Sequence, residues 1–355
     1  MTSRERVLTA AAHREPDRLP ITFDAEKEVI AKLMERFGVC TRDEVWDALH
    51  ADTRLVGADH HFCHIREENG IRYDFWGIGE KEQAYTGGTY WEYCHHPLAG
   101  LGTVGDIEAY DWPTPDELTF DTLRETRANN PDKAIIAHIT HGGYFKATHL
   151  RGMEQFMMDL GEDPELAEAI VGRVTDYLFP ALDRMCREAG DAFDIFYMAD
   201  DFCSADGPLI SPTMFRRFIK PYLARLAEIA HGHGKLFLLH VCGAVRPLLP
   251  DLIEAGVDML EPIQTSAAGM DVEGLQRDFG DRIAFYGSID LIRVLNRGTP
   301  EDVRQEARKN FRILGQGGGF IIGPGHTYIQ PDAPLENILA LYETAYNECR
   351  YGESS

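Results

Sequence analysis

Long hydrophobic runs and a leader-like start are missing from this chain. None of its 355 residues belongs to an apolar run long enough to span a bilayer. The first segment carries Glu5, Arg6, His13 and Arg14, and it lacks the apolar stretch of a secretory signal. These absences predict a soluble, cytoplasmic protein.

Cysteine is sparse and irregularly placed. The seven cysteines stand at positions 40, 63, 94, 186, 203, 242 and 349. Their odd number and scattered positions do not match the regular spacing of a disulfide framework. We therefore expect reduced thiols, which are available as metal ligands.

Positive charge is also in short supply. The chain has 35 Lys and Arg against 58 Asp and Glu, a formal net charge of −23 at pH 7, and its basic residues form no cluster. Such a surface repels a phosphate backbone, so nucleic acid is not an expected partner.

What is present is a regular alternation of short apolar runs and longer helical patterns, typical of βα units around a parallel sheet. The predicted strands are 20–23, 53–56, 134–139, 193–199, 236–240, 257–260, 283–286 and 320–322. The predicted helices of the second half are 153–159, 164–188, 212–231, 245–255, 271–279, 300–314 and 335–348. Eight strands predict an α/β fold, a (β/α)8 TIM barrel, and no linker divides the chain, so we expect residues 1–355 to form a single domain.

One segment departs from this rhythm. Residues 71–96 are rich in aromatic residues, Thr and Gly, which favours antiparallel strands over a helix. We predict an inserted β-hairpin in the N-terminal part of the barrel.

The most informative motif is His240-Val241-Cys242-Gly243, at the end of the predicted strand 236–240. Residues two apart on a strand project the same way, so His240 and Cys242 present an imidazole and a thiol together. These are two typical zinc ligands, and catalytic zinc usually takes three protein ligands and keeps one open position. The alternative interpretation is a core histidine beside a small buried cysteine.

Polar residues follow other predicted strands as well, and in a barrel the residues after the strands gather at one mouth. The residues concerned are Asp200, Asp201, Glu261, Ser288, Asp290 and His326. Glu261 and His326 are metal-ligand types, so together with His240 and Cys242 they predict a metal at the mouth.

At these residues the sequence resembles the uroporphyrinogen decarboxylase superfamily over nearly its whole length. The segments that carry the resemblance are Arg4-Glu5-Arg6-Val7, Pro16-Asp17-Arg18-Leu19-Pro20, Asp74-Phe75-Trp76-Gly77, His96-Pro97-Leu98, Leu150-Arg151-Gly152 leading to Met158-Asp159, Asp200-Asp201, Ile210-Ser211-Pro212, Lys220-Pro221, the segment 240–243, Glu254-Ala255-Gly256-Val257-Asp258 and 331–337. This resemblance implies a (β/α)8 barrel.

Two branches of the superfamily differ at positions that this chain allows us to inspect. The decarboxylases carry an M-R-Q-A-G-R-Y type motif whose arginines hold substrate carboxylates, whereas this chain reads Phe23-Asp24-Ala25-Glu26-Lys27. The other branch contains zinc-dependent methyltransferases that act on the cobalt of a corrinoid, and His240 and Cys242 match their first two zinc ligands. Their third ligand is a cysteine in a P-G-C turn, where this chain has Pro324-Gly325-His326. Either His326 or Glu261 is then the expected third ligand.

The resemblance implies a corrinoid-linked methyltransferase with zinc and a corrinoid as cofactors, the corrinoid being carried by a partner protein. Its small-molecule methyl donor or acceptor would be an ether, as in an O-demethylase, an amine or a thiol. Asp200, Asp201 and Tyr144 are the residues expected to position substrate or relay a proton, although Asp200 is equally compatible with a structural role. The alternative is a decarboxylase-like lyase that acts on a small carboxylic acid. The sequence leaves a homodimer open.

Overall fold

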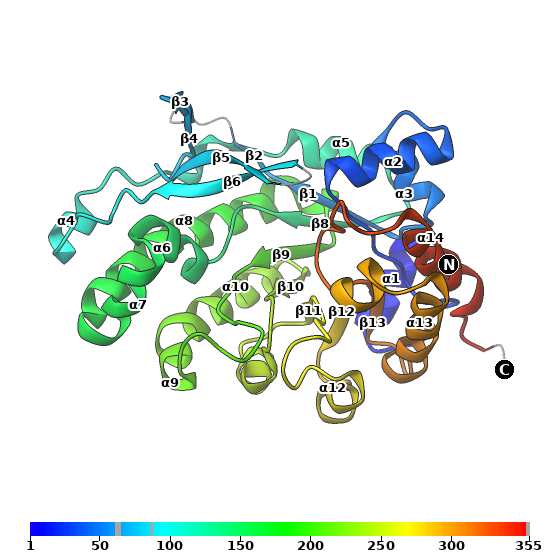
Figure 1. The fold of residues 1–355 in the computed structure, drawn as a ribbon. Helices are drawn as coiled ribbons and strands as arrows, with labels where there is room; N and C mark the ends of the chain where they lie inside the picture. The colour runs from blue at the N-terminus through cyan, green and yellow to red at the C-terminus, as the bar shows by residue number, and fades with distance from the viewer. Residues whose placement is uncertain (61–64, 86–87, 353–355) are drawn as a thin grey trace.

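The computed structural model describes residues 1–60, 65–85 and 88–352 (Figure 1). A curled parallel sheet forms its centre. The strand order is β1 (Thr53–Gly57), β8 (Ala134–His138), β9 (Ile195–Ala199), β10 (Leu236–His240), β11 (Met259–Glu261), β12 (Ala284–Ile289) and β13 (Phe320–Pro324). The predicted α/β barrel architecture is thereby confirmed, with seven of the eight predicted strands found close to their expected positions.

The eighth predicted strand, 20–23, is not a regular strand. The segment is nevertheless extended and lies between β13 and β1: the Thr22 amide donates to the Ile322 carbonyl at 2.9 Å, and the Asp52 amide donates to the Ile21 carbonyl at 2.7 Å. Pro20 has no N–H to donate, and only Ile21 forms a bridge to Ile322. The barrel therefore closes through an extended segment with too few ladder bonds to count as a strand.

Helices follow most of the strands and cover the outside of the sheet (Figure 1). They are α1 (Ser3–Ala11), α2 (Lys27–Phe37), α3 (Arg42–Ala48), α4 (Val104–Glu108), α5 (Asp121–Asn129), α6 (Gly143–Arg151), α7 (Met153–Glu162), α8 (Pro164–Ala189), α9 (Pro212–Met214), α10 (Lys220–Gly232), α11 (Leu249–Glu254), α12 (Val272–Phe279), α13 (Pro300–Leu314) and α14 (Leu335–Glu348). Several starts are encoded locally, since Thr2, Thr41, Thr103 and Thr299 each form a capping box with an acidic residue three positions on.

Two predicted helices differ in detail from the structure. The predicted helix 212–231 consists of α9, a π-helical stretch η3 (Phe215–Ile219) and α10. The predicted helix 245–255 begins with a 3-10 turn, η4 (Arg246–Leu248), before α11. The remaining short helices are η1 (Pro115–Glu117), η2 (Gly190–Ala192) and η5 (Leu291–Asn296). No helix within the described ranges is both long enough and apolar enough to cross a membrane.

The predicted N-terminal insertion is confirmed as an antiparallel sheet between β1 and β8 in the chain. Its strands are β3 (Arg66–Glu68), β4 (Ile71–Tyr73), β5 (Gly79–Tyr85) and β6 (Gly88–His95), and a small pair is formed by β2 (Asp59–His60) and β7 (Leu118–Thr119). Of the seven cysteines, Cys63 and its neighbours 61–64 lie outside the described residues, and the other six are free thiols, as expected.

The lower end of the barrel, where the strands begin, is closed by α1. Val7 and Ala11 of this helix are buried in the same apolar cluster as the side chains that fill the barrel interior. Two buried carboxylates anchor this end: Asp52 accepts hydrogen bonds from Arg6 and Arg18, and Asp194 accepts them from Arg4 and Arg127. Access to the barrel is therefore from the opposite end, where the strands finish.

Candidate metal centre

Neighbouring strands bring the predicted ligands together at the open end. His240 is the last residue of β10 and is in register with Ala199 of β9 and Glu261 of β11. All three strands are parallel, so their carboxyl ends share one mouth. The strand register thus places His240 beside Glu261 and beside the chain that continues to Asp201.

A close contact between two loops positions Cys242 beside His240 and Asp201. Gly243 has a φ of 96°, and a Cβ there would overlap the carbonyl oxygen of Ser204. This contact holds the loop after β10 against the loop after β9, and the Cys242 amide donates to Asp201 Oδ1 at 2.8 Å. The glycine of the His-x-Cys-Gly motif is therefore required by the approach of two backbones.

The two ring nitrogens of His240 have different neighbours. Nδ1 lies 2.6 Å from Glu261 Oε2 and 3.0 Å from Thr327 Oγ1, and the Thr327 hydroxyl donates to Glu261 Oε1 at 2.8 Å. Nε2 lies 3.2 Å from Cys242 Sγ and 3.6 Å from Asp201 Oδ1. Glu261 and Thr327 thus orient the ring from one side, leaving Nε2 directed at the thiol.

Asp201, His240 and Cys242 form the group of side chains best placed to hold a metal in the described part of the chain. One donor atom from each lies within 4.8 Å of the other two. The His326 imidazole lies near the Cys242 thiol, and its ring centroid is 6.1 Å from that of His240. A carboxylate, a thiolate and imidazoles are the ligand types that zinc takes in proteins, so the donor set fits that metal.

The electrostatics of the cluster favour a thiolate. Burial acts to raise the pKa of Cys242, but the neighbouring imidazoles of His240 and His326 lower it more, and the result lies below the ordinary value. Burial acts to lower the pKa of His240, but Glu261 and Cys242 raise it well above its usual range. The cluster therefore holds its charges as an ion network when no metal is present.

The other predicted residues lie around this cluster in different ways. The Asp200 carboxylate is fully buried, accepts a 2.7 Å hydrogen bond from the Phe145 amide and also accepts one from the Tyr222 hydroxyl. Burial raises the pKa of Asp200 to about 7. Its contacts cap the first turn of α6, and a Cβ at Gly142 would overlap it. The Tyr144 hydroxyl donates to Met157 Sδ at 3.1 Å, away from the ligand cluster.

Ser288 and Asp290 were also expected at the mouth, since both follow a predicted strand. Ser288 hydrogen-bonds Asn310 at 3.0 Å, and Asp290 accepts from the amides of Ile292 and Arg293 at the start of η5. Both side chains are buried in structural contacts and neither belongs to the metal-ligand group.

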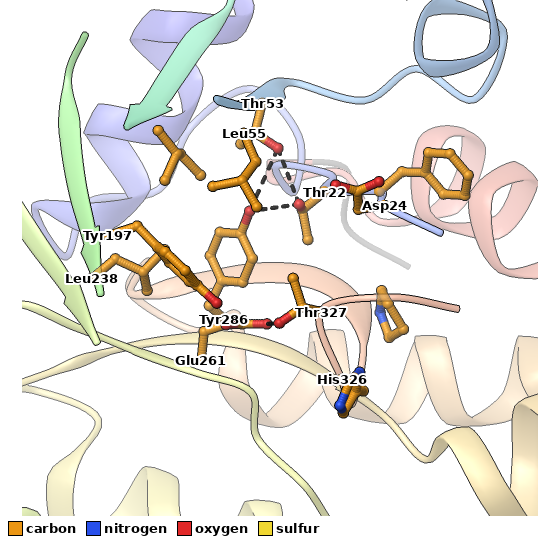
Figure 2. Close-up of a pocket in the computed structure, with 13 residues that line it drawn as sticks. Thr22, Asp24, Thr53, Leu55, Tyr197, Leu238, Glu261, Tyr286, His326 and Thr327 are labelled. Atoms are coloured by element: carbon orange, nitrogen blue, oxygen red, sulfur yellow. Dashed lines mark hydrogen bonds between the residues drawn. The ribbon is translucent and has the colours of Figure 1, made fainter. Parts of the chain in front are cut away.

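Below the cluster the barrel interior narrows to a small cavity of about 20 Å³ (Figure 2). This is room for a water molecule, which needs roughly 10–15 Å³. The walls are apolar side chains, hydroxyls and two carboxylates, and they comprise Thr22, Phe23, Asp24, Thr53, Leu55, Ile136, Tyr197, Leu238, Glu261, Tyr286, Pro324, His326 and Thr327. A substrate larger than water therefore meets the cluster from the mouth side.

Two residues of the site have no counterpart in the sequence-based prediction. Thr327 bridges Glu261 and His240, and the Tyr197 ring packs against the His240 ring at 6.2 Å. Thr327 directly follows the predicted ligand His326, and Tyr197 lies on a predicted strand two residues before its end. The signal for both was their proximity in the chain to predicted site residues.

Comparison with known proteins identifies the family of this chain. Residues 98–347 match the model of the family described as Uroporphyrinogen decarboxylase (URO-D). The chain belongs to this family. The match includes the whole metal cluster, from Asp201 after β9 to the turn that carries His326.

Individual relatives are similar over different lengths. A methylated-thiol–coenzyme M methyltransferase of Methanosarcina mazei is 25% identical over 96% of this chain and 88% of its own length. A methylcobamide:CoM methyltransferase MtaA of Methanosarcina barkeri is 32% identical, over 59% of this chain and 57% of its own. A uroporphyrinogen decarboxylase of Coxiella burnetii is 25% identical over 53% of this chain and 49% of its own.

A solved structure agrees on the fold. The methyltransferase from Methanosarcina mazei superimposes with a TM-score of 0.71 at 20% sequence identity, and the match covers 98% of both chains. The barrel and its decorations are thus those of a known architecture. Similarity to the methylated-thiol–coenzyme M methyltransferase extends over nearly the whole chain, whereas similarity to MtaA and to the decarboxylase covers 59% and 53% of it.

Proposed function

We propose that this protein is a zinc-dependent methyltransferase that moves a methyl group between a corrinoid, carried by a partner protein, and a heteroatom of a small molecule. The observation that carries the proposal is the Asp201, His240 and Cys242 cluster at the open end of the barrel. Similarity to two methyltransferases that act on thiols or on methylcobamide supports it.

Zinc bound in this cluster supplies a Lewis acid, which lowers the pKa of a bound thiol and stabilises charge on a leaving heteroatom. In the direction of thiol methylation, the sulfur bonds to the methyl carbon, the carbon–cobalt bond breaks with its electron pair left on cobalt, and the thiol proton is released. Cobalt(III) becomes cobalt(I). The reverse direction starts from a methyl ether, as in an O-demethylase, or from a methylated amine or thiol.

The residues of this chain divide the work around the metal. Cys242 and Nε2 of His240 are the two soft donors, and Asp201 is the third, because its carboxylate faces both. Glu261 holds Nδ1 of His240 and so keeps the ring in place. His326 faces the Cys242 thiol, where it either completes the metal sphere or hydrogen-bonds the thiolate.

Asp200 and Tyr144 have roles further from the metal. Asp200 is a positioning residue that fixes the first turn of α6 through the Phe145 amide and the Tyr222 hydroxyl. The ring of Tyr144 packs on Phe156. Neither side chain contacts the ligand cluster in the described part of the chain.

The alternative, decarboxylation of a substrate with several carboxylates, needs a cationic pocket. The segment that matches the decarboxylase arginine motif, 23–27, carries the carboxylates of Asp24 and Glu26 and no arginine. Uroporphyrinogen should therefore not be converted to coproporphyrinogen by this protein.

The test combines metal analysis with a methyl-transfer assay. Purified protein should hold about one zinc per chain, the stoichiometry of a single catalytic site, and should demethylate methylcobalamin when a small thiol is present, which changes the visible spectrum. Cys242→Ala should lose both properties. The matched control is Cys186→Ala, since this buried cysteine lies in α8, away from the cluster. Zinc-free wild-type protein, purified without chelators, would refute the proposal.

A further inference from the structure

Strand alternation identifies the side chains that face inward at the mouth of the barrel. Leu55, Ile136, Tyr197 and Leu238 line the cavity inside the barrel. Residues two apart on a strand project the same way, so the next inward-facing positions toward the mouth are Gly57, His138, Ala199 and His240. Two of these are small and two are imidazoles. His138 and His240 are therefore the large side chains among these four positions.

His138 is one of these four inward-facing residues at the mouth, but it is not part of the metal cluster. Its imidazole packs edge-on against Tyr197 at 6.1 Å, and Tyr197 in turn packs against His240 at 6.2 Å. No side-chain hydrogen bond to the His138 ring is found within residues 1–60, 65–85 and 88–352, and the residue is partly exposed. Burial, with a smaller effect of His60, lowers the pKa of His138 to about 4. At neutral pH it offers an uncharged ring.

Two cationic side chains near the mouth, Lys146 and Arg42, are each paired with a carboxylate. Lys146 lies near His141 and His149 and helps to lower their pKa values. Its ammonium group donates a hydrogen bond to Asp74 at 3.2 Å. On the other side Arg42 is held by Asp24. Each of these cations therefore faces a carboxylate of this chain and is not available to an anionic substrate.

The metal centre supplies no surplus positive charge either. A divalent ion held by the Asp201 carboxylate and the Cys242 thiolate is already balanced, since these donors bring two negative charges. Glu261, buried behind His240, adds a third. A sulfonate, carboxylate or phosphate entering here would lose water and gain carboxylates as neighbours, an unfavourable exchange.

From this arrangement we infer that the small-molecule partner of the site carries no anionic group, and that His138 is the specificity-determining residue that faces its non-reacting end. The inference rests on the proposed function and narrows it to neutral or cationic thiols and their methylated forms. A hydroxyl or an amine at the far end can hydrogen-bond an uncharged imidazole, whereas a sulfonate meets, in Lys146 and Arg42, cations that are already paired with carboxylates.

The test uses three thioethers that share one skeleton and differ only in charge: 2-(methylthio)ethanol, 2-(methylthio)ethylamine and 2-(methylthio)ethanesulfonate. Their dissociation constants for the zinc-loaded protein are measured by isothermal titration calorimetry. The neutral compound should bind at least about tenfold more tightly than the sulfonate, which corresponds to about 1.4 kcal/mol. Equal or tighter binding of the sulfonate by the unaltered protein overturns the inference.

The variant His138→Arg should shift the binding preference towards the sulfonate. His138→Arg places a cation at the mouth, so it should tighten sulfonate binding and weaken amine binding. The matched control His138→Gln keeps an uncharged hydrogen-bonding group and should preserve the wild-type order. If His138→Arg is folded, holds zinc and leaves the order unchanged, His138 does not face the substrate and that part of the inference is wrong. If the variant does not fold, the thioether series on the unaltered protein still decides the charge question.

Methyl transfer separates this inference from the function on which it rests. The matching thiols are 2-mercaptoethanol, cysteamine and 2-mercaptoethanesulfonate, each offered with methylcobalamin. If none accepts a methyl group while the thioethers bind in the expected order, thiol methylation fails and the charge preference stands. If the sulfonate is the best acceptor, the methyltransferase function stands and the charge preference fails.

Discussion

The two ends of the barrel both bury carboxylates, but they hold them with different partners. At the closed end, Asp52 accepts hydrogen bonds from Arg6 and Arg18, and the Ile21 amide adds another at 2.8 Å. At the open end, Glu261 faces an imidazole and a hydroxyl, and Asp200 faces a tyrosine and an amide. Arginine cannot lose its proton in a protein, whereas imidazole and thiol can exchange protons and bind metals.

This difference separates stability from chemistry along one axis of the fold. The arginines at the closed end stay protonated, so the ion-pair network there has a single charge state. The groups at the open end have two uses, an ion network without metal and a ligand set with it. Substitutions at the closed end should therefore change the free energy of unfolding, and substitutions at the open end should change metal affinity and pH response.

The largest effect is expected at the closed end. Asp52→Ala should lower the free energy of unfolding by about 3–5 kcal/mol, because Arg18 is left buried with no carboxylate and Arg6 keeps only Asp17. Urea denaturation measures this loss. Zinc bound per folded molecule should stay at the wild-type value. A variant that unfolds normally but loses zinc would show that the two ends are not separable.

A smaller effect is expected when the ring support of His240 is weakened. Glu261→Gln should reduce zinc affinity by about 10–100-fold, because the amide orients Nδ1 less strongly than the carboxylate. Competition with a chromophoric chelator measures the affinity, and Cys242→Ser provides the comparison. If Glu261→Gln loses zinc as completely as Cys242→Ser, Glu261 is itself a ligand.

The pH dependence of stability should report Asp200. Its pKa is raised from 3.8 to about 7 by burial, so the folded state binds a proton that the unfolded state has already released. The stabilising contribution is therefore complete below about pH 4 and is lost as the pH rises through 7. Asp200→Asn should flatten this part of the curve in urea titrations between pH 4 and 8. An unchanged slope would mean that the carboxyl is ionised throughout.

The smallest effect is expected for Tyr144→Phe. The lost hydroxyl hydrogen-bonds only Met157 among the described residues, so stability should fall by no more than about 0.5–1.5 kcal/mol. The pH profile of methyl transfer should not move, since the hydroxyl is outside the ligand cluster. A changed profile would return Tyr144 to the proton-transfer role that the sequence suggested.

Local pattern was enough to predict most of the barrel. The run at 236–240 predicted β10 with both of its ends, and the helical patterns 300–314 and 335–348 predicted the starts of α13 and α14. The segment 20–23 was predicted as a strand because its apolar pattern fits one. Its partners lie far away in the chain, and the pattern could not show how few ladder bonds it would make.

The candidate site was predictable in part, for a geometric reason. His240, Glu261 and His326 follow strands, and the strand-end rule brings such residues together. That Asp201 lies beside the thiol depends on the contact between Gly243 and Ser204, two loops that no strand pattern relates. The π-helical stretch within 212–231 likewise depends on packing and not on apolar spacing.

The contact between Gly142 and Asp200 has a consequence for exchanging parts between barrels. Because any side chain at 142 would occupy the volume of that carboxylate, the loop after β8 and the loop after β9 behave as one unit. A graft that takes either loop from another barrel would bring a mismatched partner. Recombination within this family should therefore keep the two loops from a single parent.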